Sequence, residues 1–173
     1  MIDGPRVWLR PLGRAHLART LQWANDPELA ALLDRARPVE PEEHQRWFQG
    51  LAAREDCRYF AIERAGSGEH IGNVWLWDIV RRHRRAEVRV LIGTPGGENK
   101  GLGTEALGLL ASYAFSHLDL HKLYAYVLAF NPRAKRAFEK AGYQVEGILR
   151  SDRWARDRYV DVYLLGRLRE DPA

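Results

Sequence analysis

The feature that most constrains the fold is a strand, glycine-rich segment, helix and strand in the middle of the chain. Residues 85–92 alternate between two faces, as a half-buried strand does. Residues 93–103 are rich in glycine, and the helix predicted over 104–118 carries a single charge, Glu105. Residues 122–130 are apolar on both strand faces. Because a helix without a polar face must be covered, this series predicts a buried helix packed on a sheet.

The flanking segments extend this alternation of strands and helices. Strands are predicted over residues 6–10, 58–64 and 69–79, and the last two form an antiparallel meander with residues 85–92. Helices are predicted from residue 16 to 23, from Pro41 onward and from Pro132 to Gly142. Two final strands, 144–150 and 159–168, are separated by a polar loop. The pattern predicts a fold of the α/β or α+β class.

Length and composition indicate one domain over residues 1–173. The chain has no apolar run near the ~20 residues that cross a bilayer, so no membrane association is expected. Its start does not resemble a signal peptide, and Cys57 is its only cysteine, so we expect a cytoplasmic protein. The net charge of +4 favours anionic ligands or reflects a solvated basic surface. No metal-ligand spacing is visible.

Residues 99–104, Asn-Lys-Gly-Leu-Gly-Thr, lie between a predicted strand and a predicted helix. Glycines allow the backbone to approach an anion closely, and the first amides of a helix point at that anion. A pyrophosphate suits such a site. The spacing is neither that of a Rossmann fingerprint nor that of a Walker loop, and glycine alone also serves simply to shape turns.

Two segments together resemble the GNAT superfamily of N-acetyltransferases. Residues 98–103 match its phosphate loop, Gln/Arg-x-x-Gly-x-Gly/Ala, except at the first position. Residues 131–143 match its later motif at Asn131, Ala134, Lys140 and Gly142, with Phe138 and Tyr143 as departures. Segments 23–28, 85–87 and 161–168 look like the RimJ/RimL-like branch. The resemblance implies a mixed, mostly antiparallel sheet of about seven strands flanked by about four helices, with a splayed strand pair holding the cofactor.

The resemblance also implies acetyl-CoA as the donor and a primary amine as the acceptor. The pantetheine arm would enter where the strand ending at Ile92 splays from the strand starting at Lys122, and no metal is implied. The implied cofactor-binding residues are Leu91, Ile92, Gly93, Asn99, Lys100, Gly101, Leu102, Gly103, Thr104, Asn131, Arg133 and Arg136.

Transfer to an amine sets chemical requirements on the site. An alkyl amine is mostly protonated at neutral pH and must lose a proton before it attacks. Glu87, on the strand lining the acetyl site, is the predicted general base. The alternative is an ion pair between Glu87 and one of the arginines at 81, 82, 84 and 85. Asp78, His83 and His121 are weaker candidates for the base.

Phe138 stands where the resembled family often has a tyrosine that protonates the departing thiolate. Tyr143, Tyr126 or water could replace that tyrosine, or the thiolate could leave unaided, since a thiol has a pKa of only ~8.5. Trp75 and Trp77 share a strand face, where they either pack the core or line an acceptor pocket.

The acceptor predicted from the sequence is a protein N-terminal α-amine or a small-molecule amine such as an amino sugar. Arginines near the acceptor side argue against polyamines. The rival hypothesis is a non-catalytic module of the same fold that binds CoA or nucleic acid, supported by Phe138 and the run Arg81-Arg82-His83-Arg84-Arg85. For the enzyme, a nucleic-acid partner is not expected, and a homodimer is consistent with the resemblance.

Overall fold

The computed structural model describes residues 1–33, 37–93 and 101–172. Within these ranges one sheet has eight strands in the order β1-β2-β3-β4-β5-β6-β8-β7, and every neighbouring pair is antiparallel except β5 and β6. The mixed, mostly antiparallel sheet is therefore confirmed. The strands are β1 (Ile2–Asp3), β2 (Val7–Pro11), β3 (Arg58–Arg64), β4 (His70–Val80), β5 (Arg85–Ile92), β6 (Lys122–Leu128), β7 (Gln144–Ala155) and β8 (Arg158–Leu168).

Five α-helices are present in the described ranges: α1 (Leu17–Ala24), α2 (Pro27–Leu32), α3 (Pro41–Leu51), α4 (Leu102–Ser116) and α5 (Pro132–Lys140). The sequence reading missed α2, because it took Asn25-Asp26-Pro27 as a stop. Asp26 instead caps a new helix: its carboxylate accepts from the amides of Glu28 and Leu29, and Pro27 occupies the first turn. It also missed the two-residue strand β1. None of these helices is long and apolar enough to cross a membrane.

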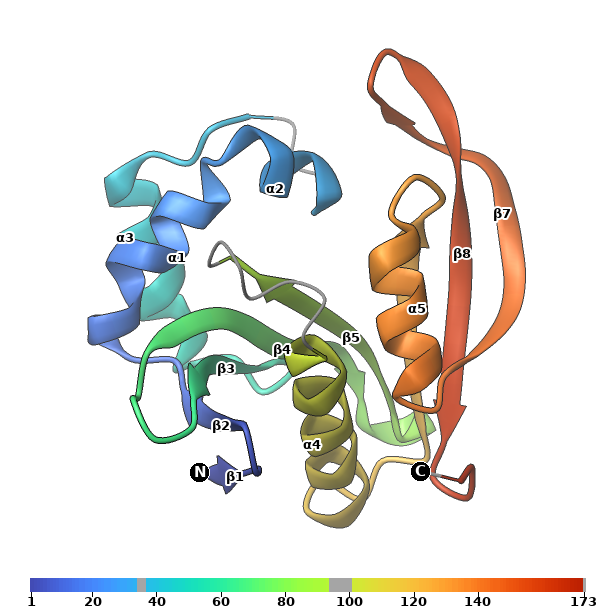
Figure 1. Ribbon diagram of the computed structural model, residues 1–173, viewed down its shortest axis with the longest axis horizontal. Helices are drawn as coiled ribbons and strands as arrows, with labels where there is room; N and C mark the ends of the chain where they lie inside the picture. Colours follow the sequence, from blue (N-terminus) through green and yellow to red (C-terminus); the bar gives the residue numbers. More distant parts are fainter. Residues whose placement is uncertain (34–36, 94–100, 173) are drawn as a thin grey trace.

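The two faces of the sheet bury different sets of residues. On one face α4 packs against β2, β4 and β5, in a core that includes Leu107, Leu110, Ala86 and Val88. On the other face Trp23 of α1 packs with Trp75 and Leu91. Figure 1 shows α1, α2 and α3 grouped beside β1–β5, and α5 beside the long β7–β8 hairpin. The nearly uncharged sequence of α4 is explained, because seven of its residues are buried.

The parallel strands β5 and β6 are paired only near their starts. Their register runs from Arg85↔Lys122 to Glu87↔Tyr124 and stops there, although β5 continues to Ile92 and β6 to Leu128. The two strands therefore splay apart beyond Glu87, as the resemblance implied.

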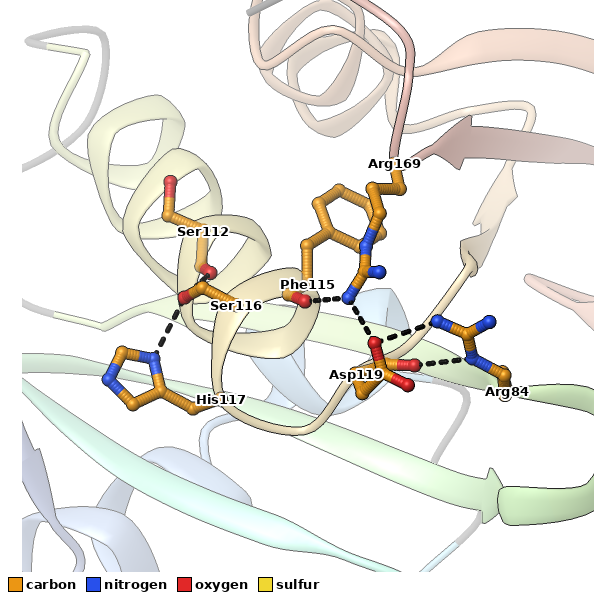
Figure 2. A network of polar contacts seen from close by, with 7 residues as sticks. All are labelled: Arg84, Ser112, Phe115, Ser116, His117, Asp119 and Arg169. Carbon is orange, nitrogen blue, oxygen red and sulfur yellow. Dashed lines mark hydrogen bonds and ion pairs between the residues drawn. The ribbon is translucent and has the colours of Figure 1, made fainter.

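A polar network holds the closed end of this splay together. Figure 2 shows the Asp119 carboxylate between the guanidinium groups of Arg84 and Arg169, at 2.8 and 2.7 Å. Arg84 Nε also donates to the Asp119 carbonyl at 2.7 Å, and Arg169 donates to the carbonyl of Phe115. The amide of Lys122 donates to the Arg84 carbonyl at 3.1 Å. These contacts tie the end of α4 to the starts of β5 and β6 and to the end of β8.

The polar loop predicted between residues 150 and 159 is wrong. β7 runs to Ala155 and β8 begins at Arg158, so the pair forms one long hairpin. Arg156 and Asp157 both have positive φ, 53° and 58°. A two-residue turn with positive φ at both positions matches the right-handed twist of the strands. Because neither residue is glycine, the turn could not be recognised from its residue types.

Candidate active site

The N-terminus of α4 presents an anion-binding surface. Gly101 precedes the helix in the left-handed region, with φ 74° and ψ 8°. The helical hydrogen bonds begin with the Glu105 amide, which donates to the Gly101 carbonyl at 3.0 Å. The amides of Leu102, Gly103 and Thr104 therefore lack helical acceptors, and the helix dipole adds a partial positive charge. The helix begins two residues earlier than predicted, so Gly103 lies in its first turn.

Helix α5 faces this N-terminus with a basic stripe. Arg133, Arg136 and Lys140 line a cavity of about 190 Å³ together with Gly101, Leu102, Gly103 and Thr104. Asn131 also lines the cavity, and its side-chain oxygen caps α5 by accepting from the Ala134 amide at 3.1 Å. The sequence reading missed Lys140 as a lining residue. Lys140 follows Arg133 by seven residues, a spacing that places both side chains on one face of a helix, and this could have identified it.

Most of the predicted binding residues converge on this cavity. Gly101, Leu102, Gly103, Thr104, Ile92, Asn131, Arg133 and Arg136 all line it. Asn99 and Lys100 lie outside the described residues.

The prediction needs correction at Leu91 and Gly93. The Gly93 amide donates to the Ile71 carbonyl of β4 at 3.0 Å, so it is not available to a pantetheine arm. Because backbone groups alternate in direction along a strand, Leu91 also points its backbone toward β4. Val90 and Ile92 line the cavity, whereas the Leu91 side chain packs with Trp23 on the opposite face. The backbone open to the splay therefore belongs to the Val88 carbonyl, Val90 and Ile92, since the Glu87↔Tyr124 pair uses the Val88 amide.

A second cavity of about 190 Å³ occupies the splay itself. It shares Val90, Asn131 and Ala134 with the first cavity, so the two are adjacent. Its remaining lining residues are Leu32, Leu33, Glu87, Val88, Arg89, Tyr126, Val127, Leu128, Phe138, Arg153 and Val162. An anion-binding end and a carboxylate-bearing end therefore lie side by side.

Glu87 is 7% exposed and is held by Arg89, two residues along the same strand face. The guanidinium of Arg89 contacts both carboxylate oxygens, at 2.6 and 3.2 Å. The predicted alternative of an ion pair is thus present, but with a different arginine. Of the four arginines first considered, Arg84 pairs with Asp119, and Arg85 lies over the Tyr124 ring at 5.2 Å. The pair does not remove Glu87 from the site, because both residues line the cavity.

The aromatic residues near the splay differ in whether a hydroxyl reaches the cavity. Phe138 forms part of the cavity wall and has none. Tyr143 is 2% exposed in the core, its hydroxyl has no partner within the described residues, and burial raises its pKa. Tyr143 is therefore excluded as a proton donor to the site. Tyr126 lines the cavity and is 44% exposed.

Next to Glu87, a β-bulge presents a second carboxylate. The β4–β5 register is irregular between Trp77 and Val80, and Asp78 within it has a φ of 50°. Its exposed carboxylate accepts from the Tyr124 hydroxyl at 3.0 Å. Burial, followed by this bond to Asp78, raises the pKa of Tyr124. Since Trp77 and Tyr124 both pair with Glu87 across the sheet, Asp78 lies near the predicted base.

The two tryptophans on β4 have different surroundings. Trp75 is buried and stacks on Tyr59 with ring centroids 5.0 Å apart, as core packing predicts. Trp77 is partly buried beneath the guanidinium of Arg54, 4.1 Å from its ring centroid. Neither lines the two cavities. No group of three potential metal-ligating side chains occurs among the described residues.

Comparison with known proteins agrees with this architecture. Residues 6–144 match the model of the acetyltransferase (GNAT) domain. The chain therefore belongs to the GNAT acetyltransferase family.

Among curated relatives, the spermidine N(1)-acetyltransferase of Escherichia coli (strain K12) is 38% identical over 102 residues, which are 59% of this chain and 53% of the relative. The spermidine N(1)-acetyltransferase of Vibrio cholerae is 35% identical over 61% of this chain and 60% of the relative. The chain thus matches little more than half the length of these proteins.

The structural likeness extends further along the chain. The spermidine N-acetyltransferase of Vibrio cholerae, solved in complex with CoA and spermine, superposes with a TM-score of 0.90. The match covers 97% of this chain and 98% of that one at 28% identity.

Proposed function

We propose that this protein transfers the acetyl group of acetyl-CoA to a primary amine of a polyamine such as spermidine. The observation that carries the proposal is the pair of adjacent cavities, with the first amides of α4 and basic side chains in one and Glu87 in the other. The names of the relatives support both the donor and the acceptor.

The residues of the first cavity fit the charged part of CoA. The first-turn amides of Leu102, Gly103 and Thr104, which have no acceptor within α4, would bind the pyrophosphate, and the α5 cations would meet the remaining phosphate charge. A Cβ built on Gly103 would lie 3.5 Å from Ile92, so a side chain at this position would take up cavity space beside these amides.

The residues of the second cavity fit the reaction. Glu87, directly or through a water, takes the proton of the acceptor ammonium, which frees the nitrogen lone pair to attack the thioester carbonyl. A C–N bond forms and the C–S bond breaks, with its electron pair left on sulfur. The ammonium nitrogen loses two protons in all, one of which is released to solvent and one of which is balanced by the proton that ends on the CoA thiol. The amide of Val90 faces the splay beyond the last β5–β6 pair, where it would stabilise negative charge developing on the carbonyl oxygen. Arg89 orients the Glu87 carboxylate.

Asp78 supports a polycationic acceptor. A polyamine carries a second ammonium a few bonds from the reacting nitrogen, and an exposed carboxylate beside the base would pair with it. The bulge that gives Asp78 its unusual φ turns this carboxylate toward Tyr124, whose hydroxyl steadies it. This outweighs the expectation from the sequence that nearby arginines disfavour polyamines, because Arg84 and Arg85 are engaged with Asp119 and Tyr124.

A second acceptor class is favoured by the two guanidinium groups in the wall of the splay cavity. Arg89 and Arg153 would suit an amine that also carries an anionic group, such as a nucleotide-linked amino sugar or a peptide with an acidic N-terminal region. The non-catalytic alternative, a module that only binds CoA or nucleic acid, predicts no turnover with any amine.

The test is release of CoA thiol from acetyl-CoA with spermidine, nucleotide-linked amino sugars and short peptides in parallel. Turnover with spermidine alone supports the proposal. Turnover only with an amine that carries an anionic group would instead identify the second acceptor class as the substrate. Glu87→Gln should lower kcat at least 100-fold, a loss typical of removing a general base. Glu69→Gln is the matched control, since Glu69 also pairs with an arginine, Arg64 at 3.1 Å, but lies outside both cavities. An equal loss in both variants would contradict the role of Glu87.

We also propose that copies of this chain associate. β7 lies at the edge of the sheet, and the hairpin exposes Val145, Ile148, Trp154 and Tyr159. A relative from Vibrio cholerae is described as dodecameric. Light scattering on the purified protein would measure the mass, and a monomer at micromolar concentration would contradict the proposal. The RimJ/RimL-like branch and the cytoplasmic location stay predictions.

A further inference from the structure

We propose that Tyr126 is the proton donor to the departing CoA thiolate, in place of the hydroxyl that Phe138 lacks. This inference rests on the proposed acetyl transfer and adds a catalytic residue to the same site.

The reaction creates a need for a proton at sulfur. When the C–S bond breaks, sulfur carries the negative charge, and a positioned acid stabilises that charge in the transition state. A thiol with a pKa of ~8.5 is a fair leaving group without help. The gain from an acid is therefore at the lower end of the usual range, about 10- to 100-fold.

Tyr126 lies in the splay between β5 and β6, where the pantetheine arm would place the sulfur of CoA. Register between β5 and β6 ends at Glu87↔Tyr124, so Tyr126 is the next residue of β6 on the same face, beyond the last β5 pair. Its ring meets that of Tyr124 edge to face, with centroids 5.8 Å apart. Tyr126 lines the cavity together with Glu87 and with Phe138, which approaches from α5. The base, the missing hydroxyl and the phenol thus share one cavity.

Elimination among the described lining residues leaves one suitable acid. Glu87 serves as the base, and Arg89 and Arg153 are guanidinium groups, which hold their protons far too tightly to act as acids. Asn131 is an amide and has no acidic proton to give. Tyr126 lines the cavity and is 44% exposed, and its hydroxyl makes no hydrogen bond within the described part of the chain.

The hydroxyls of two other tyrosines, Tyr124 and Tyr143, are not available to the departing sulfur. Tyr124 donates to Asp78, and Tyr143 is sealed in the core beside Phe138, with ring centroids 5.0 Å apart. Neither hydroxyl reaches the splay cavity.

The step balances without another reactant. As the C–S bond breaks, its electron pair stays on sulfur, and the phenol proton of Tyr126 moves to that sulfur to give the free thiol of CoA. The resulting phenolate regains a proton from water, which the exposure of Tyr126 allows. The acceptor nitrogen loses two protons, one to Glu87 before the attack and one to solvent as the tetrahedral intermediate collapses. The proton on Glu87 also leaves to solvent, and one of the two is balanced by the proton that ends on sulfur, so one proton is released per turnover.

The test compares kcat and KM of wild type and Tyr126→Phe with acetyl-CoA and the acceptor that wild type uses best. We expect kcat to fall about 10- to 100-fold, with the KM for acetyl-CoA within twofold of wild type. A double variant Tyr126→Phe/Phe138→Tyr should regain at least part of the lost kcat, because it returns a phenol to the same cavity.

Two results would overturn the proposal: a kcat for Tyr126→Phe within twofold of wild type, or a loss confined to the KM of the acceptor. The matched control is Tyr113→Phe, since Tyr113 is a tyrosine on α4 that lines neither cavity. Failure of the proposed function is distinguishable, since wild type itself would then release no thiol.

Discussion

Gly93, directly after β5, tests how tightly the Trp23 side chain of α1 packs on the sheet. A Cβ built on this glycine would lie 2.4–2.5 Å from three atoms of the Trp23 indole. Ordinary carbon contacts are about 3.5–4.0 Å, so the indole would have to move by about 1 Å. Trp23 is only 5% exposed and also packs on His70, with ring centroids 4.7 Å apart, which leaves it little room.

The expected cost of Gly93→Ala is therefore that of overpacking a core, about 1–3 kcal/mol. For a domain of this length that corresponds to a fall in Tm of roughly 2–12 °C. Thermal and urea unfolding followed by tryptophan fluorescence would measure it. The matched control is Gly108→Ala in α4, where a Cβ would meet nothing within 4 Å. That substitution should stabilise the protein by about 0.5–1 kcal/mol, since alanine is the better helix former.

A double-mutant cycle identifies Trp23 as the cause. In a Trp23→Leu background the extra methyl has space, so the cost of Gly93→Ala should shrink by at least about 1 kcal/mol. An unchanged cost in that background, or a Gly93→Ala variant as stable as wild type, would refute the reasoning.

Three further predictions concern other parts of the molecule. Gly103→Val should weaken acetyl-CoA binding about tenfold by calorimetry, equivalent to ~1.4 kcal/mol, with little change in Tm, because the methyls enter the cavity; an unchanged Kd would contradict the phosphate-site assignment. Tyr143→Phe should raise stability by about 1 kcal/mol and leave turnover unchanged, because it removes a buried hydroxyl that has no hydrogen-bond partner among the described residues; a lower Tm would show that the hydroxyl has a partner. The Arg169 guanidinium, with that of Arg84, holds the pKa of Asp119 below its usual range. Its contribution to stability is therefore present above the ordinary carboxyl pKa and is lost as pH falls through the lowered value. Unfolding curves of Asp119→Asn and wild type should differ at pH 7 and converge near pH 2, and a constant difference would contradict this linkage.

Much of the fold could be predicted because its signals are local. The alternation in β5, the uncharged face of α4 and the glycine-rich segment before it are readable from neighbouring residues, and the structure confirms the elements that they predict. The β7–β8 turn could not be read, because Arg156 and Asp157 adopt positive φ without glycine. There the pairing of two long strands imposes a backbone conformation that the residues do not themselves favour.

The positions of the candidate site residues could be predicted where one segment of sequence determines them. They could be predicted less well where they depend on contacts between segments. The spacing of Gly101 and Gly103 marked the helix N-terminus, and Asn131 marked the start of α5. The partner of Glu87 was assigned to the wrong arginines, although Arg89 shares its strand face at a spacing of two. The direction of the Leu91 and Gly93 backbone depended on the register with β4, which is a tertiary property.

Polyamine acetylation is tested most directly by incubating the purified protein with acetyl-CoA and spermidine and identifying the products by mass spectrometry. We expect monoacetylated spermidine and free CoA in equal amounts, formed by wild type and nearly abolished in Glu87→Gln. Acetyl-CoA that binds tightly but is consumed by neither spermidine nor an anionic amine would contradict this expectation, and the two cavities would then belong to a binding module.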